Sequence, residues 1–548
     1  MAEHPILERG RRAFFQSEWR TAFDHLSEAD LASALEPQDL QRLGDAGHLL
    51  GRDDEAIAFW TRAHNAYCER GDCQRAARVG FWLSMALMLR GKGSQSSGWL
   101  ARVQRLMGEQ PPCAEHGLVL VMNGLFAMFK GDAQQACGSF ERAAAIAQQF
   151  GDPDLLAFGV LGRGQALVQM QRTDEGVVLL DEAMVEVVSG QLSPIVAGII
   201  YCAVILTCER VYDLQRAHEW TVALDNWCRS QPELVAFRGQ CLVHRSKVMQ
   251  LKGDWLAALD EARRAQQLLS GRSERLAGRA FYQQAELHRL AGDFERADEM
   301  YRQADAKGFE PQPGVSLLRL AQGDLAAATA SIRRVENEAG SRQGPHAGIQ
   351  RIEVLGPFVE IMLANDDLEP ARRAANELSS LATAMSSPFL TATAAHMMGA
   401  VLLASGDPEQ ALTFLRESWT TWQQLEVHYE AARARVLIAR ACERLGDVDG
   451  AKMHIDAAAL VFERLGAQPD LARLRPSDLS AQGGVPDLSG RERQVLALVA
   501  SGKTNRQIAV ELGISEHPVA RHLSNIFNKI GVTTRTAASA FAFEHGLV

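Results

Sequence analysis

A short polar stretch near the C-terminus carries side chains that can hydrogen bond to the edges of nucleic-acid bases. Arg521 and Ser524 stand three residues apart and Asn525 follows directly, so a helix would place all three on one side. Guanidinium, hydroxyl and amide groups match the donors and acceptors that base pairs present in a DNA major groove. Such residues also occur on solvated helices, so the prediction depends on the elements that position them.

Capping signals predict four short helices around this stretch. Only Gly513-Ile514-Ser515 separates the second helix from the third, and a turn this short forces a sharp angle between two amphipathic helices. The spacing therefore predicts a helix-turn-helix. The capping signals are Ser489 with Glu492, Thr504 with Gln507, Ser515, and Thr533 or Thr534; the fourth helix would end near Gly546.

The third predicted helix has two different faces. Its apolar face would pack against the other helices and its polar face would point outward. The apolar face holds Val519, Leu523, Ile526, Phe527 and Ile530; the polar face holds Ala520, Arg521, Ser524, Asn525 and Asn528.

The order of these residues resembles the LuxR-type helix-turn-helix over about sixty contiguous positions. The resemblance rests on Leu488-Ser-Gly-Arg-Glu-Arg-Gln-Val-Leu-Ala-Leu, Gly502-Lys-Thr-Asn-Arg-Gln-Ile-Ala, Leu512-Gly-Ile-Ser515 and Val519-Ala-Arg-His-Leu-Ser-Asn-Ile-Phe-Asn-Lys-Ile-Gly-Val532. It differs at Pro518 and Ala520, where the family usually has Thr and Lys. Proline is tolerated in a first helical turn, whereas Ala520 lacks a cation that the family often directs at DNA.

The resemblance implies that the third helix reads double-stranded DNA. We expect Arg521 and Ser524 to contact bases, with Asn525 on the same face. The start of the second helix and nearby cations would hold phosphates. In this family the fourth helix, here around residues 537–543, commonly joins two copies into a homodimer. The predicted phosphate contacts are Thr504, Asn505, His517, Lys529 and Arg535.

Charge is distributed unevenly along the chain. The net charge is −10, but residues 487–548 carry +2 and the remainder −12. A mildly basic tail on an acidic body is typical of a protein whose body does not bind DNA.

Internal repetition organises the rest of the chain. Seven glycines each stand five residues before an alanine, and six of the seven are followed by Asp. Glycine ends one helix and Asp begins the next, so each marks a helical hairpin. The period is close to forty residues, with one short unit between 292 and 323, which predicts about eleven hairpins. The glycines are Gly51, Gly131, Gly253, Gly292, Gly323, Gly406 and Gly446.

Each predicted hairpin carries a small, large, small pattern on one helix face, as in Ala136/Phe140/Ala143 and Ala411/Leu415/Ser418. Over roughly residues 5–465 this pattern resembles tetratricopeptide repeats and the sensor region of MalT-type LuxR regulators. The resemblance implies a solenoid that senses an effector or a partner protein on its concave face. Tryptophans on the repeat helices could line that face, although a role in the core is favoured. They are Trp60, Trp99, Trp220, Trp255 and Trp419.

The predicted architecture is therefore all-α, with a tetratricopeptide-like helical-hairpin solenoid at residues 1–466 and a small four-helix LuxR-type helix-turn-helix domain at 487–548. Between them, residues 467–486 contain Pro476, Gly483, Gly484 and Pro486 and lose the helical period, which indicates a linker.

Motifs for catalysis, cofactors and metals are missing from the sequence. Gly502-Lys503-Thr504 imitates the end of a phosphate-binding loop, but Ala497 replaces the required glycine and no strand precedes it. Gly159, Gly162 and Gly164 fall inside a repeat helix and indicate close packing. The histidines have no metal-ligand spacing, with His396 and His454 expected as surface or core fillers, and the nine cysteines form no C-x-x-C pair. We expect no enzyme activity, cofactor or metal.

No segment is expected to enter a membrane. Residues 187–208 are uncharged, but their strongly apolar part, 195–208, is shorter than the ~20 residues of a membrane span. The charged N-terminus has no signal-peptide pattern. We therefore expect a cytoplasmic protein.

Together these features predict a sequence-specific DNA-binding transcriptional regulator whose helical repeats sense an effector or partner, with RNA polymerase as a further candidate partner. The alternative is a helical-repeat interaction scaffold with a degenerate DNA-binding tail, which Pro518 and Ala520 favour.

Overall fold

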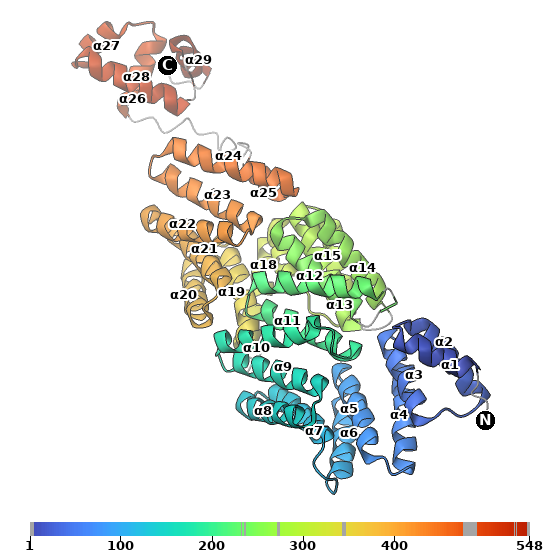
Figure 1. Cartoon of the computed structure of the whole chain (residues 1–548). Helices are drawn as coiled ribbons and strands as arrows, with labels where there is room; N and C mark the ends of the chain where they lie inside the picture. Colours follow the sequence, from blue (N-terminus) through green and yellow to red (C-terminus); the bar gives the residue numbers. More distant parts are fainter. Residues whose placement is uncertain are drawn as a thin grey trace. The chain divides into compact units, whose positions relative to one another are not determined.

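The computed structural model describes residues 5–231, 233–234, 237–270, 274–341, 347–474, 490–530, 532 and 534–544 (Figure 1). Every regular element in these ranges is an α-helix, which confirms the all-α prediction. The chain divides into two compact units, Met1–Leu471 and Ala472–Val548.

The first unit is an array of antiparallel helix pairs. Across the described residues, α1 to α24 form twelve successive hairpins, one more than the repeat spacing predicts. The first twelve helices are α1 Pro5–Phe15, α2 Trp19–Ala32, α3 Pro37–Leu49, α4 Asp53–Glu69, α5 Cys73–Leu89, α6 Gly93–Met107, α7 Ala114–Lys130, α8 Ala133–Phe150, α9 Pro153–Gln169, α10 Thr173–Val188, α11 Pro194–Arg210 and α12 Leu214–Ser230. They are followed by α13 Arg238–Lys252, α14 Trp255–Leu269, α15 Glu274–Ala291, α16 Phe294–Ala306, α17 Gly314–Ala321, α18 Leu325–Ser341, α19 Ala347–Ala364, α20 Leu368–Met385, α21 Pro388–Ala404, α22 Pro408–Gln424, α23 His428–Arg444, α24 Val448–Leu465 and α25 Gln468–Leu474.

The predicted hairpin turns are present at all seven glycines. Their φ angles lie between 72° and 92°, which an L side chain rarely adopts. Each of the six following aspartates accepts the backbone N–H three residues later, as Asp407 does from Gln410 at 3.1 Å. The short unit is explained by α17, which has only 8 residues. Helix α25 occupies part of the predicted linker, and residues 475–489 lie outside the described ranges.

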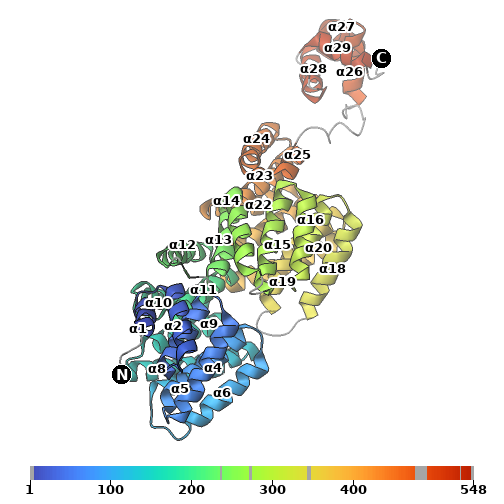
Figure 2. The same ribbon diagram turned by 90° about the vertical axis from the view of Figure 1, so that its right-hand side faces the viewer.

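The helices of the first unit form two layers. Each odd-numbered helix from α5 to α23 contacts the next odd-numbered helix, and Figure 2 shows α13 beside α15. Among the described helices α2 to α24, no successive even-numbered helices make comparable contact, so the odd helices form the inner layer of this unit. Helix α21 buries side chains around most of its circumference, whereas α22 buries one stripe: Ala411, Leu415, Ser418 and Trp422.

The repeat motif therefore faces the inner layer. Ala411, Leu415 and Ser418 are fully buried, as the small, large, small pattern predicts. The five tryptophans also lie on even-numbered helices, and Trp60 and Trp255 are buried. The other three are partly buried and pack against the hydrophobic core. The tryptophans thus belong to the packing between layers, and a role on the inner face of the solenoid is not supported.

Distant repeats also meet within the first unit. Helix α3 contacts α11, and α13 contacts α23. The rings of Tyr212 and Phe389 stack with centroids 5.3 Å apart, and those of Trp255 and Tyr429 meet edge to face at 5.3 Å. The array therefore coils back on itself and brings inner helices from different repeats close together.

The glycine-rich part of α9 permits close helix packing, as predicted. A Cβ added at Gly162 would lie 2.3 Å from the ring of Phe140, and one added at Gly164 would lie 2.9 Å from the Gly176 carbonyl oxygen. These glycines are packing residues of a helix interior.

The structure also places the two histidines, the nine cysteines and the uncharged segment that the sequence singled out. His396 is 4% exposed and is a core residue, while His454 is half-buried against Trp419. Six of the nine cysteines are buried, and all nine are free thiols. Helix α11 covers most of the uncharged segment, and within the described ranges no helix is both long and apolar enough to span a membrane.

The second unit contains four helices in its described part. Helices α26 and α29 pack together, and α28 contacts the other three. They are α26 Gly490–Ala500, α27 Asn505–Leu512, α28 Glu516–Ile530 and α29 Arg535–Glu544.

We predict that Gly162→Ala destabilises the first unit by about 1–3 kcal/mol, because the new methyl group would displace the buried ring of Phe140. Gly138→Ala is the matched control, since it lies on α8 and a Cβ there meets nothing within 4 Å. It should stabilise by up to about 1 kcal/mol through helix propensity. Denaturant unfolding of both variants measures the difference, and equal effects of the same sign would contradict the packing argument.

Candidate DNA-binding site

The turn between α27 and α28 has the geometry that its sequence predicts. Thr504 caps α27: the Gln507 N–H donates to the Thr504 hydroxyl, and the Thr504 N–H donates to the Gln507 side chain at 2.8 Å. At the other end, Gly513 has a φ of 65° and the Ile514 N–H donates to the Ala509 carbonyl at 3.0 Å. This left-handed residue ends α27 and redirects the chain into α28 within three residues.

A shared hydrophobic core fixes the four helices. On α28, Val519, Leu523 and Ile526 are buried, and they pack with residues of α26, α27 and α29. These are the positions that the sequence assigns to the apolar face of this helix. The core residues are Val495, Leu496, Val499, Ile508, Ala509, Val519, Leu523, Ile526, Ala538 and Ala542.

The opposite face of α28 is open to solvent. Ala520, Arg521, Ser524 and Asn525 are all exposed, and within the described ranges the Arg521 guanidinium has no hydrogen bond or ion pair. Arg521 and Ser524 lie three residues apart and are therefore neighbours on the helix surface. The side chains of His517 and Asn528 lie outside the described residues.

Most of the residues predicted to contact phosphate also hold the domain together. Arg535 donates to the Asn505 side chain at 2.8 Å and to the Lys503 carbonyl, so it joins α29 to the start of α27. Lys529 forms an ion pair with Glu492 at 2.8 Å, and Glu492 is only 5% exposed. Local spacing does not indicate these contacts, because the partners are 30 to 37 residues apart.

Arg506 was not singled out from the sequence. It lies in the first turn of α27, is exposed, and has no hydrogen bond or ion pair with any described residue. The sequence could have indicated Arg506 as a phosphate contact, because it lies beside Thr504 and Asn505 at the positive end of the helix dipole. By contrast, Arg491 donates to the Leu512 carbonyl at 2.7 Å, and Lys503 pairs with Glu511.

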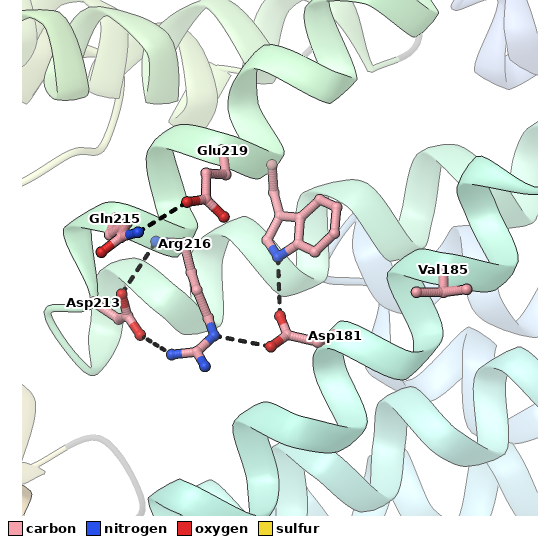
Figure 3. Close-up of a pocket in the computed structure, with 7 residues that line it drawn as sticks. Asp181, Val185, Asp213, Gln215, Arg216 and Glu219 are labelled. Atoms are coloured by element: carbon pink, nitrogen blue, oxygen red, sulfur yellow. Dashed lines mark hydrogen bonds and ion pairs between the residues drawn. The ribbon is translucent and has the colours of Figure 1, made fainter.

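A pocket of about 410 Å³ on the first unit offers no comparable chemistry (Figure 3). Its polar groups bind one another: Arg216 lies between Asp181 and Asp213, and Gln215 donates to Glu219 at 3.1 Å. Asp213 also accepts the Arg216 N–H and so caps α12. This arrangement joins α10 to α12, and the Arg216 and Trp220 donors are both taken up by pocket carboxylates.

Comparison with known proteins identifies a family over the C-terminal part of the chain. Residues 486–542 match the family "Bacterial regulatory proteins, luxR family". The transcriptional regulatory protein LiaR of Bacillus subtilis is 40% identical over 80 residues, which cover 14% of this chain and 36% of LiaR. The probable transcriptional regulatory protein SgaR of Hyphomicrobium methylovorum is 44% identical over 63 residues, which cover 12% of this chain and 30% of SgaR. The chain thus spans about a third of the length of these relatives.

Solved structures resemble the chain more distantly. Yeast Tom70 has 12% sequence identity and a TM-score of 0.28, with 87% of this chain and 96% of Tom70 covered. The Cut9–Hcn1 hetero-tetramer of the APC/C has 12% sequence identity and a TM-score of 0.33. The match covers 86% of this chain and 96% of the solved chain.

We predict that Lys529→Ala destabilises the helix-turn-helix by about 1–3 kcal/mol, because the buried carboxylate of Glu492 loses a cation. Lys503→Ala is the control. It removes a surface pair with Glu511 and should change stability by less than about 1 kcal/mol. Native-state hydrogen exchange of the α26 and α28 amides reports the unfolding free energy of this domain. A larger loss in Lys503→Ala would contradict the assignment of Lys529.

Proposed function

Because residues 486–542 are a LuxR-type helix-turn-helix domain, we propose that the protein is a sequence-specific transcription regulator that inserts α28 into the DNA major groove. The supporting observation is the exposed face of α28, which presents Arg521, Ser524 and Asn525 on a helix held by a tight turn and a buried core. Arg521 and Ser524 would contact base edges, where a guanidinium can donate two hydrogen bonds to guanine.

Phosphate contacts would come from the surroundings of α27. Its N-terminus presents backbone N–H groups beside Thr504 and Asn505. His517, Lys529 and Arg535 complete the proposed set, and Arg506 joins it because it is exposed without a described partner. Lys529 and Arg535 can contact phosphate while keeping their internal partners, since both retain further N–H donors.

A homodimer on DNA follows from the weak charge of the domain. Residues 487–548 carry a net charge of only +2, so one copy would bind DNA weakly. Two copies on a two-fold site would double the contacts. The proposed dimer contact is α29, which buries Ala538 and Ala542 on its inner side and exposes Thr536 on the other.

The repeat array would supply the regulatory input. In its inner layer of odd-numbered helices, polar side chains of different repeats meet, as Glu209 does with His244 and Glu360 with Arg433. A binding surface for an effector or partner requires such groups. We propose residues 1–466 as this sensor, 467–486 as the connection and 487–548 as the DNA-binding domain of a cytoplasmic protein. RNA polymerase is a candidate partner of the DNA-bound form.

The test compares Arg521→Ala with Arg506→Ala. Arg521→Ala should cost about 1–3 kcal/mol at a specific site and reduce the preference for that site, because it removes a base contact. Arg506→Ala should weaken specific and non-specific duplexes to a similar extent, because phosphate contacts carry no sequence information.

Gel shifts at physiological salt, with an operator found by footprinting and a shuffled duplex, measure both effects. Similar sequence-independent losses in both variants would contradict these roles. If the wild-type protein binds no duplex better than non-specific DNA, the interaction-scaffold function replaces the regulator.

A further inference from the structure

Three cations on successive inner helices of the first unit lack close partners. They are Arg210 at the end of α11, Lys247 on α13 and Arg279 on α15. Arg210 and Arg279 are half-buried, and Lys247 is 44% exposed at its side chain. Within the described ranges none of the three donates a hydrogen bond.

One carboxylate serves two of these cations, and only at a distance. Glu209 is 3.8 Å from both Lys247 and Arg279, too far for a hydrogen bond. Its short contact, 2.7 Å, goes instead to Nδ1 of His244, which is fully buried. Burial alone would raise the pKa of Glu209, but His244, Lys247 and Arg279 together hold it well below its usual range.

Arg210 lies in an unfavourable electrostatic position. Burial and the neighbouring guanidinium of Arg279 lower its pKa, which Glu209 and the exposed Glu353 offset only in part. A half-buried guanidinium with five free donors beside a second guanidinium costs stability unless something else pairs with it.

The neighbouring inner helices show how cations are paired elsewhere in this layer. Arg433 on α23 lies 2.7 Å from Glu360 on α19 and 3.1 Å from Glu430. Arg289 on α15 lies 2.6 Å from Glu286. Several arginines of the same inner layer thus form direct ion pairs, whereas Arg210, Lys247 and Arg279 keep donors to spare.

We propose that Arg210, Lys247 and Arg279 form a binding site for an oxyanion group, a phosphate or a carboxylate, of the effector that the repeat array senses. This inference rests on the proposed function and names the ligand chemistry of its sensor. The three cations lie near two carboxylates, those of Glu209 and Glu353, whereas the chain as a whole has a net charge of −10. Positive charge concentrated at one point of an acidic protein would attract and hold an anion that the rest of the surface repels. Guanidinium groups suit phosphate and carboxylate geometry in particular.

The experiment measures thermal unfolding of the full chain with increasing sodium pyrophosphate or sodium citrate, at ionic strength held constant with chloride. We expect a saturable rise in Tm with at least one of the two anions. Pyrophosphate alone would identify a phosphate-bearing ligand, and citrate alone a carboxylate-bearing one.

Arg210→Gln and Arg279→Gln should each weaken the apparent affinity at least about tenfold, because each removes a charge-assisted hydrogen-bond donor. Arg279→Lys should retain part of the binding, since the charge remains. Arg263→Gln on the outer helix α14 is the matched control: it loses a comparably long ion pair, 3.6 Å to Asp260, and should bind as the wild type does.

No saturable shift with either anion, or the same shift in wild type, Arg210→Gln and Arg279→Gln, would overturn the site. Without anion, Arg210→Gln should unfold at or above the wild-type Tm, because a like-charge contact is relieved; a clear drop would show that Arg210 is structural. Gel shifts on the same samples separate this inference from the proposed function. If Arg279-dependent anion binding is found without specific DNA binding, the anion site stands and the regulator proposal fails alone.

Discussion

A helical hairpin has more apolar surface than its two helices can bury against each other, and the first unit is built around this constraint. The inner helix α21 shows it most clearly, because its Leu390, Ala394, Met397 and Val401 are buried together with residues on its other faces. Such a helix is stable only between neighbours, so each repeat depends on the next. Close glycine packing, as between α8 and α9, and ring contacts between distant repeats follow from the same need.

The same constraint acts on a smaller scale in the second unit. Helix α28 can expose a polar face only because its other face is fixed by Val519, Leu523 and Ile526 in the shared core. Gly513 and the Thr504 cap determine where α27 begins and ends, and therefore where α28 starts. The internal pairs of Lys529 and Arg535 then join α28 and α29 to the rest of the domain. The same few contacts therefore stabilise the fold of the domain and hold the exposed polar face of α28 in place.

Local signals explain which parts could be predicted from the sequence. The Gly-Asp turns, the Thr504 cap and the two faces of α28 depend on residues within one or two helical turns, and all agree with the structure. The two helix layers depend on how repeats stack. The repeat pattern therefore left an inner-face role open for the tryptophans beside the favoured core role, and the structure supports the core role. The ion pair of Lys529 with Glu492 and the grouping of Arg210, Lys247 and Arg279 join residues from different helices, so spacing along the chain gives no sign of them. Arg506 was within reach of sequence reasoning, since it lies in the capped first turn of α27.

The central claim is that α28 reads DNA sequence, and a competition binding assay tests it most directly. The full-length protein would be bound to a fluorescent duplex from a footprinted promoter at physiological salt, then displaced with the same unlabelled duplex or with a shuffled one. The account predicts that the promoter duplex competes at least about 10³-fold better, the lower end of specific DNA recognition. Equal competition by the two duplexes would contradict it.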